Sequence, residues 1–137
     1  MTPCYSKQET VRFGHCDPAG IVFYPRYFEM LNALIEDWFT LGLGINYAEL
    51  LGPRRVGVPT VSLHSDFKRI SRMGDRLTQT IAVKKVGRTS LTLTANFSGE
   101  DGERVAFEQV LVCTDLNTHT PQPFPDDLRA ALEKFLS

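Results

Sequence analysis

The chain has 137 residues, of which 42% are hydrophobic and 23% are charged, with a formal net charge of −1. This composition predicts a single soluble globular domain over residues 1–137, and the absence of a basic excess argues against general nucleic-acid binding. The first ten residues are polar, and no apolar run approaches the ~20 residues that a membrane span needs. We therefore expect neither a secretion signal nor a membrane segment.

Three cysteines, Cys4, Cys16 and Cys113, are widely spaced along the chain. Their odd number and spacing match neither a disulfide framework nor a zinc site. A reducing compartment is the simplest interpretation. The sequence therefore predicts a cytoplasmic protein with no metal site.

The N-terminal third predicts a strand, a turn and one long helix. Val11 and Phe13 favour a strand over residues 7–13, and residues 17–20 (Asp-Pro-Ala-Gly) are typical of a turn. Pro25 suits the first turn of a helix, where its missing N–H costs nothing. Apolar residues then repeat every three or four positions to about Leu41 and cover most of the helix surface. We expect this helix to be buried on most sides.

The rest of the chain predicts mainly strands. A short helix over residues 45–51 is followed by alternating segments at 59–70, 77–86, 90–98 and 104–116, and by a tail helix from a capping Asp126 to Phe135. This order predicts an α+β fold in which an antiparallel five-stranded sheet wraps around one long central helix. Edge strands of such a sheet invite pairing with a second copy, so we expect a dimer.

Residues 12–28 place one acidic side chain, Asp17, among small and apolar neighbours, eight residues before Pro25. A carboxylate held there lies near the open amide N–H groups of a helix beginning, which favour negative charge. Pro25 has no N–H, so Tyr24 is the expected backbone donor. Asp17 then attacks a carbonyl, or activates water against it, while the amide stabilises the oxyanion. The alternative is that Asp17 only caps its own turn.

The same segment resembles the signature of the 4-hydroxybenzoyl-CoA thioesterase family of hotdog-fold enzymes, in the run Gly14-His15-Cys16-Asp17-Pro18-Ala19-Gly20-Ile21-Val22-Phe23-Tyr24-Pro25. The likeness extends through Val58-Pro59-Thr60-Val61-Ser62 and covers most of the chain in element order. It implies one hotdog domain that hydrolyses acyl-CoA with Asp17 as nucleophile or general base. It also implies coenzyme A as a product, no separate cofactor, and sites at the interface of a homodimer or homotetramer.

His15 and Cys16 raise the possibility of a Cys–His nucleophile. Adjacent residues of an extended segment point to opposite faces, however, so the two side chains can hardly pair. A cysteine in this position is more often a small buried hydrophobe. His15 is instead expected to tune Asp17 or orient water, with a solvent-edge histidine as the alternative.

The acyl group is expected to contact Tyr27, Asn32, Thr60 and His64. The resemblance implies that an acidic group near the position of Asn32 contacts the phenol in the hydroxybenzoyl-specific members. Asn32 departs from that pattern, so the acyl group stays open between aryl, short-chain and hydroxylated types. A structural role is the alternative for His64.

The densest basic segment is the predicted hairpin over residues 84–90. Arg and Lys side chains suit the phosphates of coenzyme A, and similar hairpins carry nucleotide contacts in the family. We expect Lys85, Arg88, Thr89 and Ser90 to bind coenzyme A, with a merely solvated face as the alternative. Lys68, Arg69 and Arg72 form a second candidate patch.

Two other classes of function remain open on the sequence. A hotdog hydratase or dehydratase needs a base and an acid facing the acyl chain, which His64 with Glu29 or Glu36 would supply. A non-catalytic acyl-CoA-binding module would keep the fold and the basic hairpin without depending on Asp17.

Overall fold

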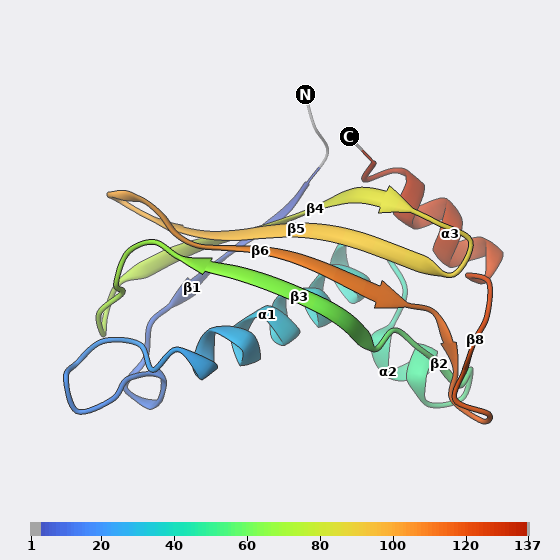
Figure 1. The fold of residues 1–137 in the computed structure, drawn as a ribbon, viewed down its shortest axis with the longest axis horizontal. Helices are drawn as coiled ribbons and strands as arrows, with labels where there is room; N and C mark the ends of the chain where they lie inside the picture. The colour runs from blue at the N-terminus through green and yellow to red at the C-terminus, as the bar shows by residue number, and fades with distance from the viewer. Residues whose placement is uncertain (1–3, 137) are drawn as a thin grey trace.

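A computed structural model describes residues 4–136 of the chain. Its main sheet has five antiparallel strands in the order β1-β4-β5-β6-β3 (Figure 1). The elements, in chain order, are β1 (Tyr5–Thr10), η1 (Phe13–His15), α1 (Pro25–Asp37), η2 (Trp38–Gly42), α2 (Tyr47–Leu51), β2 (Val56–Gly57), β3 (Thr60–Phe67), β4 (Arg76–Val86), β5 (Ser90–Gly99), β6 (Gly102–Val112), β7 (Thr114–Asp115), β8 (Thr120–Pro121) and α3 (Asp126–Glu133).

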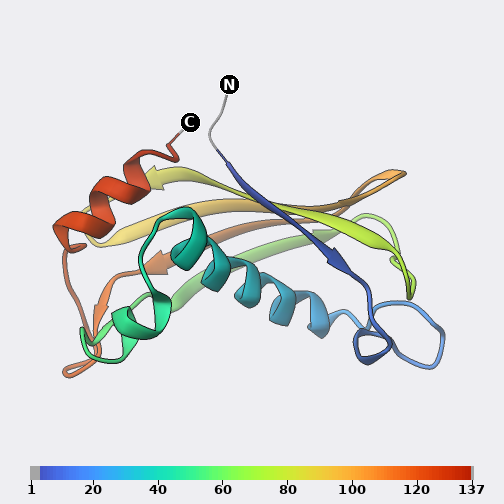
Figure 2. The ribbon, with the colours of Figure 1, turned by 180° about the vertical axis from the view of Figure 1, so that it is seen from behind.

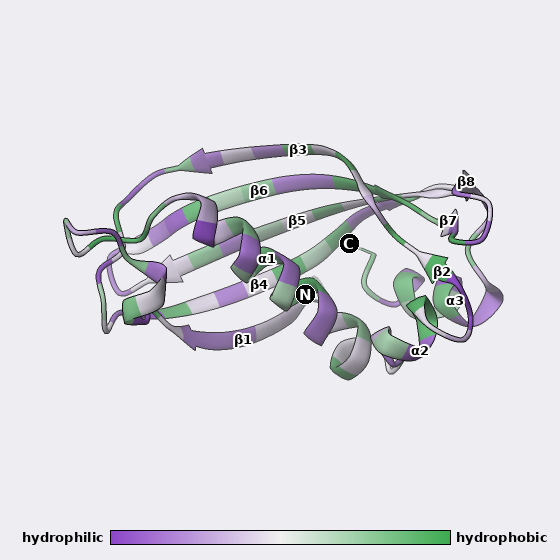
Figure 3. Ribbon diagram, turned by 90° about the horizontal axis from the view of Figure 1, so that it is seen from below, coloured by the Kyte–Doolittle hydropathy of each residue, from purple (hydrophilic) through white to green (hydrophobic). Residues whose placement is uncertain are grey.

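The sheet curves around α1, which lies on its concave face (Figures 1 and 2). Alternating residues of β4, β5 and β6 point at the helix, and Figure 3 shows the resulting hydrophobic and polar bands along these strands. Burial of one face per strand is the usual consequence of such alternation. The expected antiparallel sheet around one long helix is confirmed. The core-facing strand residues include Leu77, Ile81, Val83, Leu91, Leu93, Phe97, Val105 and Phe107.

Helix α1 buries only one of its faces. Leu31, Leu34 and Ile35 pack against the sheet, whereas Glu29 and Asn32 are exposed. The expectation of a helix buried on most sides is therefore wrong, because polar residues share one stripe of the cylinder. The stripe of exposed polar residues faces away from the sheet. At its C-terminus α1 continues into the π-helical turn η2, which ends at Gly42, close to the predicted end near Leu41.

Strand β3 forms one edge of the sheet and carries a β-bulge. Thr60 pairs with Leu111 and Ser62 pairs with Val110, so Val61 is an extra residue on β3. A one-residue slip moves all the following side chains to the other face. Thr60 therefore points toward α1, whereas His64 points away from it.

Several element boundaries differ from the expectations. The first strand ends at Thr10, because the chain turns into η1 after two intervening residues. The expected last strand is split into β6 and β7, and β7 joins β2 and β8 in a small second sheet that the sequence did not predict. Asp126 is the first residue of α3 rather than its cap, which is Pro125. No helix in the described part of the chain is long and apolar enough to cross a membrane.

Candidate functional site

The turn that carries Asp17 is closed by backbone hydrogen bonds. The Asp17 N–H donates to the Ile21 carbonyl at 3.0 Å, and the Gly20 N–H donates to the Asp17 carbonyl at 2.9 Å. Gly20 has a φ of +79°, a conformation that glycine adopts without strain. Cys16 and Val22 then form an isolated antiparallel bridge, so the turn returns directly to the start of α1.

The carboxylate of Asp17 has one engaged oxygen and one free oxygen. Its Oδ1 accepts the N–H of Ala19 at 2.8 Å, which is the usual way that an aspartate caps a turn. Within residues 4–136 this is the only hydrogen bond of the carboxylate, and the side chain is half-buried. The capping role and a chemical role are thus compatible, since each uses a different oxygen.

The N-terminus of α1 leaves one backbone donor open beside this turn. The Phe23 N–H donates to the His15 carbonyl at 2.9 Å. The Tyr24 N–H has no acceptor among the described residues, and Tyr24 directly precedes Pro25, the first residue of α1. Of these two amides, only that of Tyr24 is available to a bound anion or carbonyl oxygen.

An apolar cleft of about 280 Å³ adjoins the start of α1. Tyr27 is buried in its wall, and burial raises the pKa of its hydroxyl, which keeps the phenol protonated. Phe67 contributes a half-exposed ring that packs edge-on against Tyr24. The cleft is lined by Ile21, Val22, Tyr24, Tyr27, Phe67, Lys68, Arg69 and Ile70, so it contains two residues of the second basic patch.

The segment between β3 and β4 supports the turn that carries Asp17. The Val22 N–H donates to the Ser71 carbonyl at 2.9 Å. The buried Arg104 guanidinium in turn donates to the Ile70 carbonyl, the Ser71 hydroxyl and the Asp75 carboxylate at 3.0–3.1 Å. The Asp75 pKa lies below its usual range because the Arg72 N–H and then Arg104 donate to it. Arg104 therefore links the sheet to the turn through one ion-pair network.

His15 is not brought into contact with Asp17. Its Nδ1 accepts the N–H of Arg12 at 2.8 Å, which closes the short helix η1. Because Nδ1 is the acceptor, the neutral ring carries its proton on Nε2. The imidazole lines a separate cleft between β1 and α1 together with Lys7 and Gln79.

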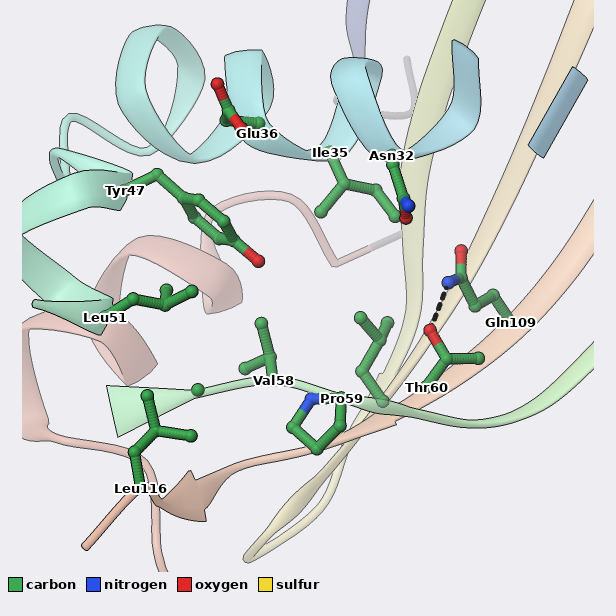
Figure 4. A pocket seen from close by; sticks show the side chains of 12 residues that line it. Asn32, Ile35, Glu36, Tyr47, Leu51, Val58, Pro59, Thr60, Gln109 and Leu116 are labelled. Atoms are coloured by element: carbon green, nitrogen blue, oxygen red, sulfur yellow. Dashed lines mark hydrogen bonds between the residues drawn. The ribbon is translucent and has the colours of Figure 1, made fainter. Parts of the chain in front are cut away.

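A larger cavity of about 410 Å³ lies further along α1, between that helix, α2 and β3 (Figure 4). Asn32 and Thr60, two of the predicted acyl-contact residues, both line it. Tyr27 belongs to the first cleft instead. The other polar residues of the cavity are Glu36, Tyr47 and Gln109, and its apolar wall includes Ile35, Leu51, Val58, Pro59, Leu111 and Leu116.

His64 lies on the outer face of the sheet, away from both cavities. It pairs across the strands with Glu108, and its Nε2 is 3.3 Å from the Asp66 carboxylate. Thr60 and His64 would share a face in a regular strand, but the bulge at Val61 separates them. The structure therefore does not bring His64 together with Thr60 or with the helix carboxylates.

The basic hairpin lies at the opposite end of the sheet from Asp17 (Figures 1 and 2). It joins β4 to β5 and packs against α3, where Arg129 donates to the Gly87 and Arg88 carbonyls. Lys85 and Arg88 are exposed, and Thr89 and Ser90 are half-buried. The eleven residues of β4, at about 3.3 Å each, separate the hairpin from the Asp17 turn of the same chain.

Similarity to known proteins agrees with this arrangement. Residues 11–132 match the thioesterase-like superfamily, and the match contains the Asp17 turn, α1 and the whole of strands β3 to β6. The chain belongs to this superfamily. Thioester hydrolysis is the activity for which the superfamily is named.

Individual relatives within the superfamily act on aromatic thioesters according to their names. A 1,4-dihydroxy-2-naphthoyl-CoA hydrolase of Thermosynechococcus vestitus is 29% identical over 96% of this chain and 90% of its own. A 4-hydroxybenzoyl-CoA thioesterase of a Pseudomonas species is 33% identical over 66% of this chain and 64% of its own.

A thioesterase superfamily structure from Jannaschia sp. CCS1 has a TM-score of 0.90 at 23% identity, covering 100% of this chain and 97% of its own. This likeness shows the fold, and the expected hotdog fold is confirmed.

The sequence does not predict a role for two residues of the site, Gln109 and Arg104. Gln109 is polar but faces inward on β6 like Val105, Phe107 and Leu111. A polar residue at an otherwise apolar, inward-facing position is the one sequence feature that could have indicated it. Arg104 carried no signal, because its partners lie on segments distant in the sequence. No group of three or more metal-ligating side chains occurs in residues 4–136.

Proposed function

We propose that the protein is an acyl-CoA thioesterase that hydrolyses aromatic acyl-CoA thioesters at Asp17. One observation carries the proposal: the free carboxylate oxygen of Asp17 and the unpaired Tyr24 N–H lie on the two ends of one closed turn at the start of α1. Membership of a thioesterase superfamily supports the reaction. The names of the naphthoyl-CoA and hydroxybenzoyl-CoA relatives support an aromatic acyl group.

The chemistry assigns separate roles to the two groups. The Tyr24 N–H donates to the thioester carbonyl oxygen, and this hydrogen bond strengthens as negative charge develops in the transition state. The free oxygen of Asp17 either attacks the carbonyl carbon and expels the coenzyme A thiolate, or removes a proton from an attacking water. In the first route water then cleaves the mixed anhydride. Both routes convert thioester and water into a carboxylic acid and a thiol, with no cofactor.

The complete site is proposed to form between two copies of the chain. Strand β3 is an unpaired edge in the described chain, and its Val61, Leu63 and Phe67 side chains are 62%, 40% and 49% exposed. Such an edge pairs readily with another strand. Antiparallel pairing of two β3 strands about their midpoint sets Thr60 of one copy beside Phe67 of the other. The large cavity of one copy then adjoins the cleft next to Tyr24 in the second copy.

The same symmetry supports a role for the basic hairpin in binding coenzyme A. Antiparallel pairing brings the hairpin end of one copy to the Asp17 end of the other. Lys85, Arg88, Thr89 and Ser90 of one copy are therefore proposed to bind the phosphates of a substrate that reacts at the second copy's Asp17. Lys68 and Arg69, which line the cleft beside Tyr24, are available to the same substrate.

Cytoplasmic location is proposed because Cys4, Cys16 and Cys113 are free thiols.

The decisive variant is Asp17→Asn. Its side-chain oxygen still accepts the Ala19 N–H, so the turn keeps its cap while the charged oxygen is lost. We expect kcat for aromatic acyl-CoA to fall about 10²–10⁴-fold with little change in the unfolding temperature. The release of the coenzyme A thiol, measured with a thiol-reactive dye, reports the rate. Full hydrolysis by the variant would remove Asp17 from the mechanism.

Further measurements separate the alternatives. Single-turnover hydrolysis in ¹⁸O-labelled water puts the label into Asp17 only if Asp17 is the nucleophile and water attacks the aspartyl carbonyl of the mixed anhydride. Trapping the anhydride with hydroxylamine identifies the nucleophilic route whichever carbonyl the water attacks, whereas a general base forms no anhydride. A wild-type chain that binds aromatic acyl-CoA without hydrolysing it would favour the binding module. The hydratase class is not proposed, because His64 lies beside Asp66 and Glu108 on the outer face rather than facing Glu29 or Glu36.

A further inference from the structure

The large cavity contains a buried hydrogen-bond acceptor that the protein itself does not use. Gln109 is only 3% exposed, and its Oε1 has no hydrogen-bond partner within residues 4–136. Its Nε2 donates to the Thr60 hydroxyl at 2.7 Å. Figure 4 shows the amide between Thr60 and helix α1, at the wall of the cavity. A buried acceptor without a partner destabilises the folded protein, so a donor from outside the chain would be stabilising here.

Gln109 and Thr60 together present one acceptor and one donor. The Thr60 oxygen accepts from Gln109, so its own O–H proton is free to donate into the cavity. If the amide were turned over, Thr60 would donate to the amide oxygen, and the amide N–H would become the free donor. Either orientation leaves one donor and one acceptor side by side. A single hydroxyl group, which both donates and accepts, satisfies this pair.

The rest of the cavity fits the flat or apolar body of a small acyl group. Ile35, Val58 and Leu111 contribute apolar side chains to its wall. Across the cavity the Tyr47 hydroxyl also points inward (Figure 4), and burial followed by the charge of Glu36 raises the pKa of Tyr47. Tyr47 is therefore a neutral phenol. The wall thus combines apolar side chains with several convergent polar groups, and convergent polar groups of this kind fix the orientation of a small molecule.

We propose that the Gln109–Thr60 pair selects acyl groups that carry a hydroxyl on the ring, by binding that hydroxyl in its neutral form. The inference rests on the proposed function, because it takes the cavity to hold the acyl part of the thioester. An acyl group without the hydroxyl leaves the Gln109 acceptor buried and unpaired. Sites built around a hydrogen bond to a substrate hydroxyl discriminate strongly against analogues that lack it.

The test compares matched substrates on the wild-type protein and on a Gln109→Leu variant. The substrates are benzoyl-CoA and its 2-, 3- and 4-hydroxy derivatives, which differ by one hydroxyl. The wild type is expected to favour at least one hydroxylated isomer over benzoyl-CoA by about tenfold or more in kcat/KM. Gln109→Leu is expected to abolish this ratio, because leucine fills the space without a buried acceptor.

Two controls make the result specific. Gln79→Leu changes the same residue type on the same inner face of the sheet, but in the cleft beside His15, and it should leave the ratio unchanged. Thr60→Val removes the hydroxyl at nearly constant shape and should lower the ratio even if Gln109→Leu folds poorly. A wild type that hydrolyses all four substrates equally, or a ratio unaffected by both cavity variants, would overturn the inference and leave the thioesterase intact. No hydrolysis of any aromatic acyl-CoA would instead refute the proposed function.

Discussion

Two buried glutamines illustrate how much a single side chain depends on its surroundings. Both Gln79 and Gln109 occupy inward-facing strand positions that are otherwise apolar, and both have amide atoms without partners in residues 4–136. Gln109 shares one hydrogen bond with Thr60 and lines the large cavity. Gln79 has neither its oxygen nor its nitrogen paired, so its burial is a cost to the folded state.

Replacing Gln79 with leucine should therefore stabilise the protein. The variant removes two unpaired polar atoms and adds apolar contact under α1, and we expect the free energy of unfolding to rise by about 1 kcal/mol or more. Urea denaturation followed by tryptophan fluorescence measures the change, because the single Trp38 is fully buried. A loss of stability in Gln79→Leu would show that the amide is satisfied by a group other than those of the chain.

At the scale of elements, the segment between β3 and β4 connects the stability of the fold to the turn that carries Asp17. Ser71 holds the turn through its carbonyl, while Asp75 and Arg104 hold the segment. Arg104 is only 9% exposed in its side chain and also binds Asp101. An ion-pair network with one buried member is more sensitive to the loss of a partner than an exposed pair is.

This network predicts a loss of stability in acid. The pKa of Asp75 is lowered in the folded protein by the Arg72 N–H and then by Arg104, and the Asp101 pKa is lowered by Arg104. A carboxyl with a lowered folded pKa stabilises the protein above its unfolded value of about 3.9 and loses that contribution as pH falls through the folded value. We expect the free energy of unfolding to decline below about pH 4.

Asp75→Asn provides the comparison. The amide oxygen keeps an acceptor for the Arg72 N–H but cannot titrate, so the variant should be less stable at pH 7 and show a shallower decline in acid. Unfolding in urea at a series of pH values from 7 to 3 measures both slopes. Parallel curves for the two proteins would mean that Asp75 does not contribute to the acid sensitivity.

The elements differ in how well the sequence predicts them. The turn at Asp17 and the start of α1 follow from local rules on proline, glycine and helix termini, so the candidate pair of Asp17 and the Tyr24 amide could be named in advance. The positions of Thr60 and His64 depend on a bulge that has no local signature, so the sequence predicts both in one pocket and the structure separates them. The apolar repeat of α1 predicts burial on most sides, whereas Glu29 and Asn32 form part of a polar stripe that stays exposed.

At the scale of the whole molecule, the described chain supplies only part of the proposed site. The Asp17 turn and the basic hairpin lie at opposite ends of the sheet, and the large cavity lies along α1 from the cleft beside Tyr24 (Figures 2 and 4). Local sequence patterns contain no distances across the sheet, so the sequence predicts the turn, the hairpin and the acyl-contact residues in one site. Pairing of a second copy along β3 is the simplest way to bring them close together.

Leu63→Lys tests this pairing directly. Leu63 lies near the middle of β3, so two copies of the lysine would meet close to the twofold axis and repel each other. We expect a wild-type dimer and a folded, monomeric variant with little hydrolytic activity, measured by analytical ultracentrifugation and circular dichroism. Thr94→Lys, an exposed position on the central strand β5, is the matched control. An active monomer would show that one chain contains a complete site.

The extra residue in β3 also affects how this chain should be aligned with others. A protein that lacks the equivalent of Val61 would present its next side chains with reversed orientation, even if every later residue were identical. Residues matched column by column through the strand would then compare a cavity wall with an outer surface. A gap at Val61 has to be considered before any difference at Thr60 or His64 is interpreted as a change of substrate.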